Sequence, residues 1–400
     1  MESLLPYLSD WAGLLLRWLH VIVAIAWIGA SFYFVWLDNH LLKPTAADLQ
    51  AKGVDGELWA VHGGGFYNPQ KYRVAPASLP QHLHWFYWES YWTWMSGFAL
   101  FTVLYLFNAD TFLIDRQVHD WSAAAAIAAA LGFLAGGWIV YDLICRLFGR
   151  TRTGSIGNDG TVLGLLAVFI VIAAWGSAQL FAGRAAFLIT GAMIATMMSA
   201  NVFFWIIPGQ RQVIADMRAG RPVDPLHGQR GKQRSVHNTY LTLPVLIAML
   251  SNHYGMLYSH PLNWAVLCVL MLAGALVRTW FVKRHTGANA WPLIVLVLAL
   301  LAGLIAGLRP APAPAPRVAQ VSTAQVQAIV GQRCLMCHNA QFAQKDMHLQ
   351  SAELIEQHAA QIYQQVVVQK TMPLNNATQI TDEERALIGA WFKSRTAPGP

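Results

Sequence analysis

Eight stretches of the chain are apolar over nearly their whole length, and each predicts a helix. They lie near residues 11–37, 90–108, 122–145, 161–181, 185–207, 237–257, 262–282 and 290–308. Each stretch approaches or exceeds the roughly 20 residues that a helix needs to cross the hydrocarbon core of a bilayer. The pattern therefore predicts an all-α protein: a polytopic membrane bundle of about eight transmembrane helices over residues 1–308, ahead of a smaller and more polar C-terminal part.

Composition supports a membrane location independently of the pattern. The 400 residues are 56% hydrophobic and only 12% charged, whereas ordinary soluble domains carry about 25% charged residues. The net charge of +7 does not indicate a nucleic-acid partner. Residues 317–400 hold seven Lys and Arg against six Asp and Glu, so the excess sits in short loops between the apolar stretches.

The positive charges also predict the orientation in the membrane. Loops 38–89, 146–160, 208–236 and 283–289 carry fifteen Lys and Arg together, whereas loops 109–121, 182–184 and 258–261 carry two. Because basic loops stay in the cytoplasm, we expect the first group inside. Both chain ends then lie outside, on the periplasmic face of a bacterial inner membrane.

The sequence RCLMCH at 333–338 is the attachment signature of a c-type haem. Two thiols separated by two residues reach the two vinyl groups of one porphyrin, and the histidine that follows ligates the iron. No second CxxC completes a zinc site, and no βαβ pattern indicates a thioredoxin fold. We therefore expect one haem c on Cys334 and Cys337, with His338 as an axial ligand. Its attachment outside the cytoplasm agrees with the charge count.

Residues 318–400 have the pattern of a small class I cytochrome c. A first helix leads into the haem motif, and a second begins where Thr381 and Glu384 form a capping box, with Trp391 packed near the crossing of the two helices. Met372, 34 residues after His338, is the expected sixth ligand; its competitors are Met347, His348 and His358. Residues 309–317, RPAPAPAPR, predict an extended, semi-rigid linker.

Ionisable residues inside membrane helices are functional candidates because they are costly to bury there. Arg17 and His20 lie one helical turn apart near the outer face, and His253 ends another helix at similar depth. His20 and His253 could hold a haem b, or one could bond a carbonyl while the other rests among headgroups. A second haem between His84 and His237 needs other helices, because His237 and His253 are turned by about 160° from each other.

Four segments carry a resemblance to a known family. They are WLHVIVAIAWIGASFYFVWLDNHL at 18–41, VHGGGFYNPQKY at 61–72, RSVHNTYLTLPVLIAMLSNHY at 234–254, and RCLMCH. With them, the whole chain resembles the membrane-bound urate oxidase (urate hydroxylase) family of bacterial purine catabolism, whose members join an eight-helix membrane domain to a C-terminal cytochrome c.

The resemblance implies oxidation of urate to 5-hydroxyisourate, with water supplying the added oxygen. Electrons would pass to the fused cytochrome and then to a soluble cytochrome c or a terminal oxidase. Arg17, His20 and His253 are the candidate catalytic residues. Because urate is an anion, its site needs Arg or Lys with amide partners. Two sets meet this need: Arg17 with Gln179 outside, or Arg73, Asn238 and Arg278 inside.

Two other functions stay open at this point. The chain could be a membrane-tethered cytochrome c that accepts electrons from quinol and performs no urate chemistry. It could also be a porphyrinogen oxidase, which the first helix alone suggests. The 234–254 segment and the fused cytochrome favour urate.

Overall fold

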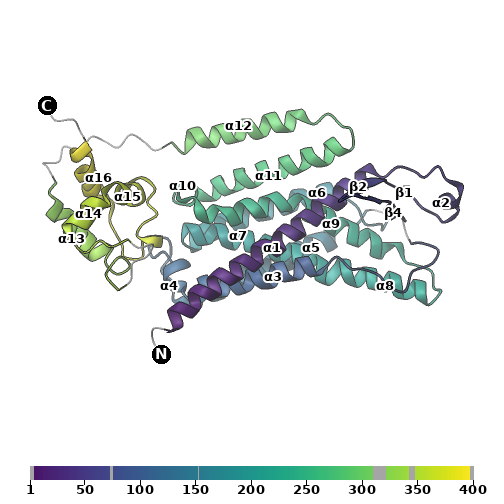
Figure 1. The fold of residues 1–400 in the computed structure, drawn as a ribbon, viewed down its shortest axis with the longest axis horizontal. Helices are drawn as coiled ribbons and strands as arrows, with labels where there is room; N and C mark the ends of the chain where they lie inside the picture. The colour runs from purple at the N-terminus through teal and green to yellow at the C-terminus, as the bar shows by residue number, and fades with distance from the viewer. Residues whose placement is uncertain (1–3, 73–74, 152, 310–320, 342–346, 397–400) are drawn as a thin grey trace.

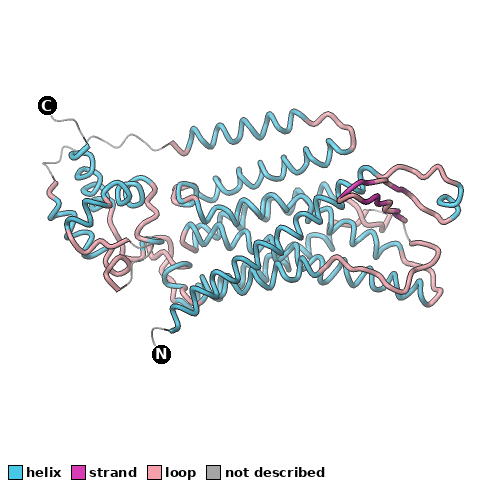
Figure 2. Tube along the Cα trace, in the orientation of Figure 1, coloured by secondary structure: helices cyan, strands magenta, loops and turns pink. Residues whose placement is uncertain are grey.

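The computed structural model describes residues 4–72, 75–151, 153–309, 321–341 and 347–396. These residues form a long helical bundle and a small helical domain at one end of it, called here the C-terminal domain (Figure 1). Helices dominate both parts, and the strands are confined to one loop (Figure 2). Except for Arg309, the predicted Pro/Ala linker lies outside the described residues.

All eight predicted apolar segments are helical. They are α1 (Leu4–His40), α3 (Trp88–Phe101) with its continuation η1 (Thr102–Leu106), α5 (Ala123–Phe148), α6 (Asp159–Leu180), α7 (Gly183–Asn201) with η2 (Val202–Ile206) and α8 (Ile207–Arg218), α9 (Pro225–Leu250), α11 (Asn263–His285) and α12 (Trp291–Gly307). Five are long and apolar enough to cross a membrane, judged by length and composition: α1, α5, α6, α7 with its continuation, and α11. The apolar helical bundle is confirmed, and the count of eight spans stays a prediction.

The centre of the bundle is α7, which packs against α3, α5, α6 and α9. Small residues permit this close packing. A Cβ built on Gly137 of α5 would lie 2.8 Å from the sulfur of Met193, and one on Gly191 would lie 2.9 Å from the Cβ of Ala248. Because a glycine on one helix leaves room for the side chain of its neighbour, these helices lie close together, and the polar groups that they carry can meet inside the bundle.

The two ends of the bundle differ in charge and in what they carry. The basic end consists of loops 38–89, 146–160, 208–236 and 283–289, and it contains α2 (Ala47–Ala51) and α8. It also contains two antiparallel strand pairs. The strands β2 (Ala60–His62) and β3 (Gly65–Tyr67) form a hairpin, and β1 (Gly56–Glu57) pairs with β4 (Gln70–Lys71) on either side of it in the sequence. The docked end, formed by α4 (Ala109–Phe112), η3 (Ser251–His253) and α10 (Gly255–Tyr258), faces the C-terminal domain (Figure 1). This grouping agrees with the predicted topology. Which membrane face each end meets stays a prediction.

The C-terminal domain is built around its own buried core. Its helices are α13 (Thr323–Arg333), α14 (Ala352–Gln357), α15 (Ala359–Ile362), η5 (Tyr363–Val368), η6 (Leu374–Asn376) and α16 (Asp382–Thr396). The predicted capping box is present, because the Glu384 amide donates to Thr381 Oγ1 and the Thr381 amide donates to Glu384 Oε2. Trp391 is buried and its Nε1 donates to Thr323 Oγ1 at 3.2 Å, so the predicted contact between the two terminal helices is confirmed.

Candidate functional site

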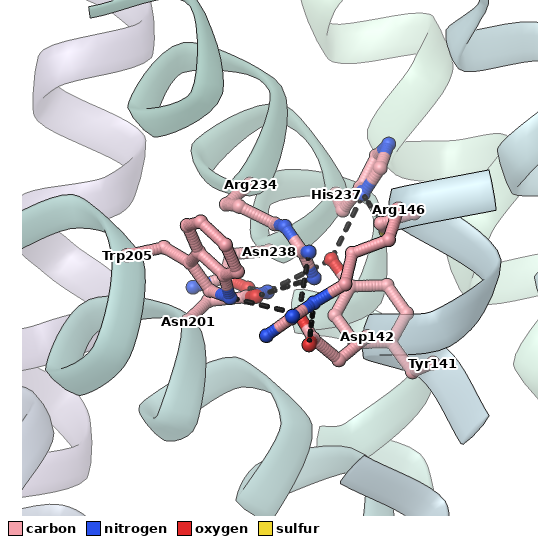
Figure 3. A network of polar contacts seen from close by, with 9 residues as sticks. Tyr141, Asp142, Arg146, Asn201, Trp205, Arg234, His237 and Asn238 are labelled. Carbon is pink, nitrogen blue, oxygen red and sulfur yellow. Dashed lines mark hydrogen bonds and ion pairs between the residues drawn. The ribbon is translucent and has the colours of Figure 1, made fainter. Parts of the chain in front are cut away.

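A buried polar network joins three helices in the half of the bundle nearer the basic end (Figure 3). Asp142 of α5 is its centre. One carboxylate oxygen accepts from Arg234 Nη2 at 2.6 Å and Trp205 Nε1 at 2.7 Å, and the other accepts from Arg146 Nε at 2.6 Å. Arg234 is 4% exposed and its guanidinium also lies over the Trp205 ring. The buried Arg234 guanidinium is therefore paired with a carboxylate inside the protein.

From Arg234 the network continues through fully buried side chains to a histidine. Asn201 accepts from Arg234 Nη1 at 3.3 Å and donates to the Tyr141 hydroxyl at 2.9 Å and to Asn238 Oδ1 at 2.8 Å. The Tyr141 hydroxyl lies 2.8 Å from His237 Nδ1. Because the Tyr141 oxygen already accepts from Asn201, its own hydrogen is free to be donated to His237. The other ring nitrogen, Nε2, then carries a proton.

That Nε2 points toward the edge of the network. It is buried without a hydrogen-bond partner among the described residues, and the nearest carboxylate oxygen is Asp159 Oδ1 at 3.8 Å. Gln233 Nε2 donates to the same Asp159 oxygen at 2.8 Å. Both Asp159 and Gln233 line a pocket of about 430 Å³ at the basic end, together with Lys232. Asp159 therefore lies between His237 Nε2 and this pocket.

A second polar cluster lies at the docked end and involves helices that are far apart in sequence. Asn252 Oδ1 accepts from the Tyr105 hydroxyl at 3.1 Å and from Arg184 Nε at 3.3 Å. The guanidinium of Arg17 is exposed and lies next to Gly13 of its own helix. We call Tyr105, Arg184 and Asn252 the docked-end cluster.

The two histidines proposed to hold a haem b have different surroundings. His20 packs on α3, where a Cβ on Gly97 would lie 2.8 Å from its Cε1. Its Nδ1 lies 3.1 Å from Ser96 Oγ, and Ser96 Oγ donates to the carbonyl of Trp92. His253 is exposed and forms no hydrogen bond with a described residue. A haem b between them stays a prediction, and no step below depends on it.

Several other predicted positions do not converge. Asn238 donates to the Met198 carbonyl inside the buried network, whereas Arg278 stacks on Phe32 of α1 with its Cζ 3.6 Å from the ring centroid. Gln179 is exposed. His84 packs on Phe86, away from the partners of His237, so nothing in these contacts joins the two histidines. Arg73 lies outside the described residues.

The RCLMCH motif begins at Arg333, the last residue of α13. Cys334 packs against that core, and burial raises the pKa of its thiol to about 11. Cys337 is exposed. His338 Nδ1 lies 3.2 Å from the Met347 carbonyl, which is the bond that fixes the ring of a metal-ligating histidine and leaves Nε2 for the metal. These residues fit a covalently bound haem c.

Met372 also packs against this core, together with Cys334. Its carbonyl accepts from Arg385 Nη1 at 2.8 Å, and the same nitrogen donates to the Val366 carbonyl. Arg333, the residue before Cys334, donates to the Thr378 carbonyl at 2.7 Å. Arg333 thus ties Thr378 to the end of α13, just before Cys334, and Arg385 of α16 ties Met372 to η5.

The segment around Met372 also touches the bundle. Thr371 packs on Gly255 at the start of α10, and η6 contacts α4. A pocket of about 180 Å³ lies between the two parts, lined by Asp115 and Arg116 on one side and by Asn376 and Gln379 on the other. Burial raises the pKa of Asp115 here. The C-terminal domain therefore contacts the bundle through residues 371–379.

Sequence reasoning missed several residues of the two clusters. Arg234 was counted as a loop charge, although it lies in α9, and Tyr105, Tyr141 and Trp205 were not distinguished from other aromatic residues of the membrane helices. Tyr105 and Trp205 both lie in π-helical segments, η1 and η2. Such segments are frequent at functional sites, but no pattern of apolar positions reveals them.

Fold and site together define a class: a bundle of apolar helices of membrane-spanning length, joined to a small domain with a CxxCH motif. The comparison with protein families gives the particular family. Residues 6–308 match the model described as urate oxidase N-terminal, and the chain belongs to this family. Searches of curated proteins and of solved structures gave no match. The match covers the bundle and ends before the C-terminal domain.

Proposed function

We propose that the bundle oxidises urate to 5-hydroxyisourate and that the electrons pass to a haem c held by the C-terminal domain. The family match over residues 6–308 supports urate as the substrate. One observation carries the rest: the segment beside Met372 rests on the bundle through Thr371 and Gly255. A domain that receives electrons from the bundle needs such a contact, because electron transfer weakens steeply with distance.

The reaction balances without molecular oxygen. A water oxygen forms a bond to C5 of the urate monoanion, two electrons leave the ring, and one proton is released to give neutral 5-hydroxyisourate. Within this proposal Arg17 binds the anion, while His20 or His253 accepts the proton. In His20 the Nδ1 atom bonds Ser96, and Nε2 would be the nitrogen that accepts the proton.

The C-terminal domain would accept the electrons one at a time. When bound, a haem c supplies a one-electron acceptor, held by thioether bonds to Cys334 and Cys337 and by axial bonds to His338 and Met372. A thioether ligand favours a high reduction potential. The onward acceptor would be a soluble cytochrome c or a terminal oxidase, and the membrane would be the bacterial inner membrane with the C-terminal domain in the periplasm.

The test is to add urate to the purified oxidised protein and record the α band of the reduced haem. We expect urate to reduce the haem and 5-hydroxyisourate to accumulate. Cys334→Ala with Cys337→Ala should abolish turnover with cytochrome acceptors and leave urate binding unchanged. If a quinol reduces the haem and urate does not, the chain is instead the tethered electron carrier, and the proposal is wrong.

A further inference from the structure

We propose that Arg385 is the residue that holds Met372 in place as the second axial ligand of haem c. This inference rests on the proposed function, which assigns a haem c to the C-terminal domain and its second axial bond to Met372. Arg385 is a positioning residue, because it acts through the main chain of Met372 and not on the iron itself.

Arg385 occupies a core position of α16. Ile388 and Trp391 follow it at the three-residue spacing that keeps side chains on one face of a helix, and they are 0% and 1% exposed. Arg385 is itself 7% exposed. An apolar side chain would fill this position without burying a charge, and an arginine is almost never fully buried unless it is paired. The guanidinium therefore needs partners inside the domain.

The partners are the main-chain carbonyls of the segment that contains Met372. Arg385 Nη1 donates to the Val366 carbonyl and, at 2.8 Å, to the Met372 carbonyl. The Met372 amide donates in turn to the Gln365 carbonyl at 3.2 Å. The main chain of Met372 is therefore fixed on both sides of its α-carbon, while its side chain packs against the same core as Cys334. A thioether on a main chain fixed in this way ligates the iron at a lower cost in ordering.

The two carboxylates that flank Arg385 on α16 are paired with other cations. Asp382 pairs with Lys370 at 2.9 Å, and Glu384 pairs with Arg333 at 3.0 Å. Within the described ranges of the chain, Arg385 forms no ion pair with a carboxylate. The two carbonyls are thus its polar partners, and moving the Met372 carbonyl away would remove a partner from a buried cation. Because that loss is costly, Arg385 resists displacement of the ligand segment.

The segment that Arg385 holds also contacts the bundle. Thr371, the residue before Met372, packs on Gly255. Its amide donates to the Gln365 carbonyl at 2.9 Å, next to the bond from the Met372 amide. Contact with the bundle and the bond from Arg385 therefore act on adjacent residues. A ligand segment without Arg385 would move more easily and would leave the sixth position of the iron open to other ligands.

The experiment measures imidazole binding to the ferric haem of the full haem-loaded protein in detergent. Imidazole competes with the methionine sulfur for the iron, so its affinity reports how firmly Met372 is held. The first variant is Arg385→Met, which places an apolar side chain at a core position and should keep the protein folded. We expect imidazole to bind this variant about tenfold or more tightly than the wild type, because the lost hydrogen bonds have a charged donor.

Two further variants complete the comparison. Arg385→Lys keeps a positive charge without the guanidinium fork and should increase the imidazole affinity by a smaller factor; it also supplies the measurement if Arg385→Met does not fold. The matched control is Arg395→Gln on the same helix, because Arg395 pairs with the partly exposed Glu356 at 2.9 Å. The control should keep the wild-type affinity. The unfolding temperature of each variant shows whether it is folded.

A double variant separates positioning of Met372 from a general structural role. In Met372→Ala no sulfur competes with imidazole, so adding Arg385→Met should change the affinity by only about twofold or less. An equal effect of Arg385→Met with and without Met372 would overturn the inference, as would an unchanged affinity in both single Arg385 variants. If the wild-type protein carries no covalent haem, the haem assignment of the proposed function fails, and this inference fails with it.

Discussion

Thr371 of the C-terminal domain packs so closely on Gly255 of the bundle that any side chain at position 255 would overlap its methyl group. A Cβ built on Gly255 lies 3.4 Å from the Cβ of Thr371. Gly255 is thus a contact point that only glycine allows. The same contact makes the docking of the two parts accessible to a direct chemical test.

We expect the double variant Gly255→Cys with Thr371→Cys to form a disulfide, because paired cysteines have Cβ atoms about 3.5–4.5 Å apart. Mass spectrometry of peptides with and without reductant would detect the bond. The matched control pairs Thr371→Cys with Thr286→Cys at the basic end and should stay reduced. Crosslinking of both pairs to the same extent would mean that the C-terminal domain has no preferred docking position on the bundle.

Removing only one partner of the ion pair between Asp142 and Arg234 should strongly lower the free energy of unfolding. Asp142→Ala leaves the buried Arg234 guanidinium without its carboxylate, and we expect a loss of about 3–5 kcal/mol in unfolding free energy. Adding Arg234→Met should recover most of this loss. Denaturant unfolding in detergent would measure both. Asp120→Ala, which breaks an exposed pair with Arg116, should cost at most about 1 kcal/mol.

Met372→Ala should remove the weak red absorption that a methionine sulfur gives when it ligates ferric haem, and should lower the reduction potential. The control is Met347→Ala, because it keeps the main-chain carbonyl that lies 3.2 Å from His338 Nδ1. Persistence of the band in the Met372 variant, with its loss in the Met347 variant, would reverse the ligand assignment.

Acid should destabilise the C-terminal domain in part through Glu384. Burial alone would raise the pKa of this carboxyl, but hydrogen bonds from Arg333 and the Thr381 amide outweigh burial and lower the pKa below its ordinary value of 4.5. The lowered pKa adds stability above pH 4.5, and this stability is lost as pH falls through the folded-state pKa. Haem absorbance recorded against pH should show a shallower acid transition for Glu384→Gln than for Glu383→Gln.

Reporter fusions can test the orientation of the protein in the membrane. A phosphatase that is active only outside the cytoplasm should be active when fused after Pro400 and inactive when fused within 208–236. The physical reason is the fifteen-to-two distribution of Lys and Arg between the two sets of loops. The reverse activity pattern would invert the topology and separate the CxxCH motif from the machinery that attaches haem outside the cytoplasm.

The apolar pattern predicted the helices well because burial in a bilayer demands long uninterrupted apolar segments. The prediction was least accurate at α9, which begins at Pro225, twelve residues before the predicted segment. The early turns of α9 carry Arg230, Lys232 and Arg234 and look like a loop to a hydropathy scale. They are helical because Asp224 caps them and because Gln233 and Arg234 bond to partners on α5 and α6.

Individual residues of the site could be predicted from the sequence, but which of them lie together could not. His237 and Asn238 were candidates from the sequence, and the structure joins them through Tyr141 and Asn201. The partners of Asn252 depend on how η1 and α7 are rotated about their axes. Tyr105 reaches Asn252 from a π-helical turn, and a 3.6-residue period cannot place a side chain there. The pairing of His20 with Ser96 likewise follows from the close approach of Gly97.

The last helix of the bundle, α12, stands at its edge and packs chiefly against α11 (Figure 1). Val297 is its buried residue. The chain that leads to the CxxCH motif therefore leaves the bundle through a helix at its edge. Sequence changes after α12 would leave the interior of the other helices intact, so the bundle and the C-terminal domain are free to diverge independently.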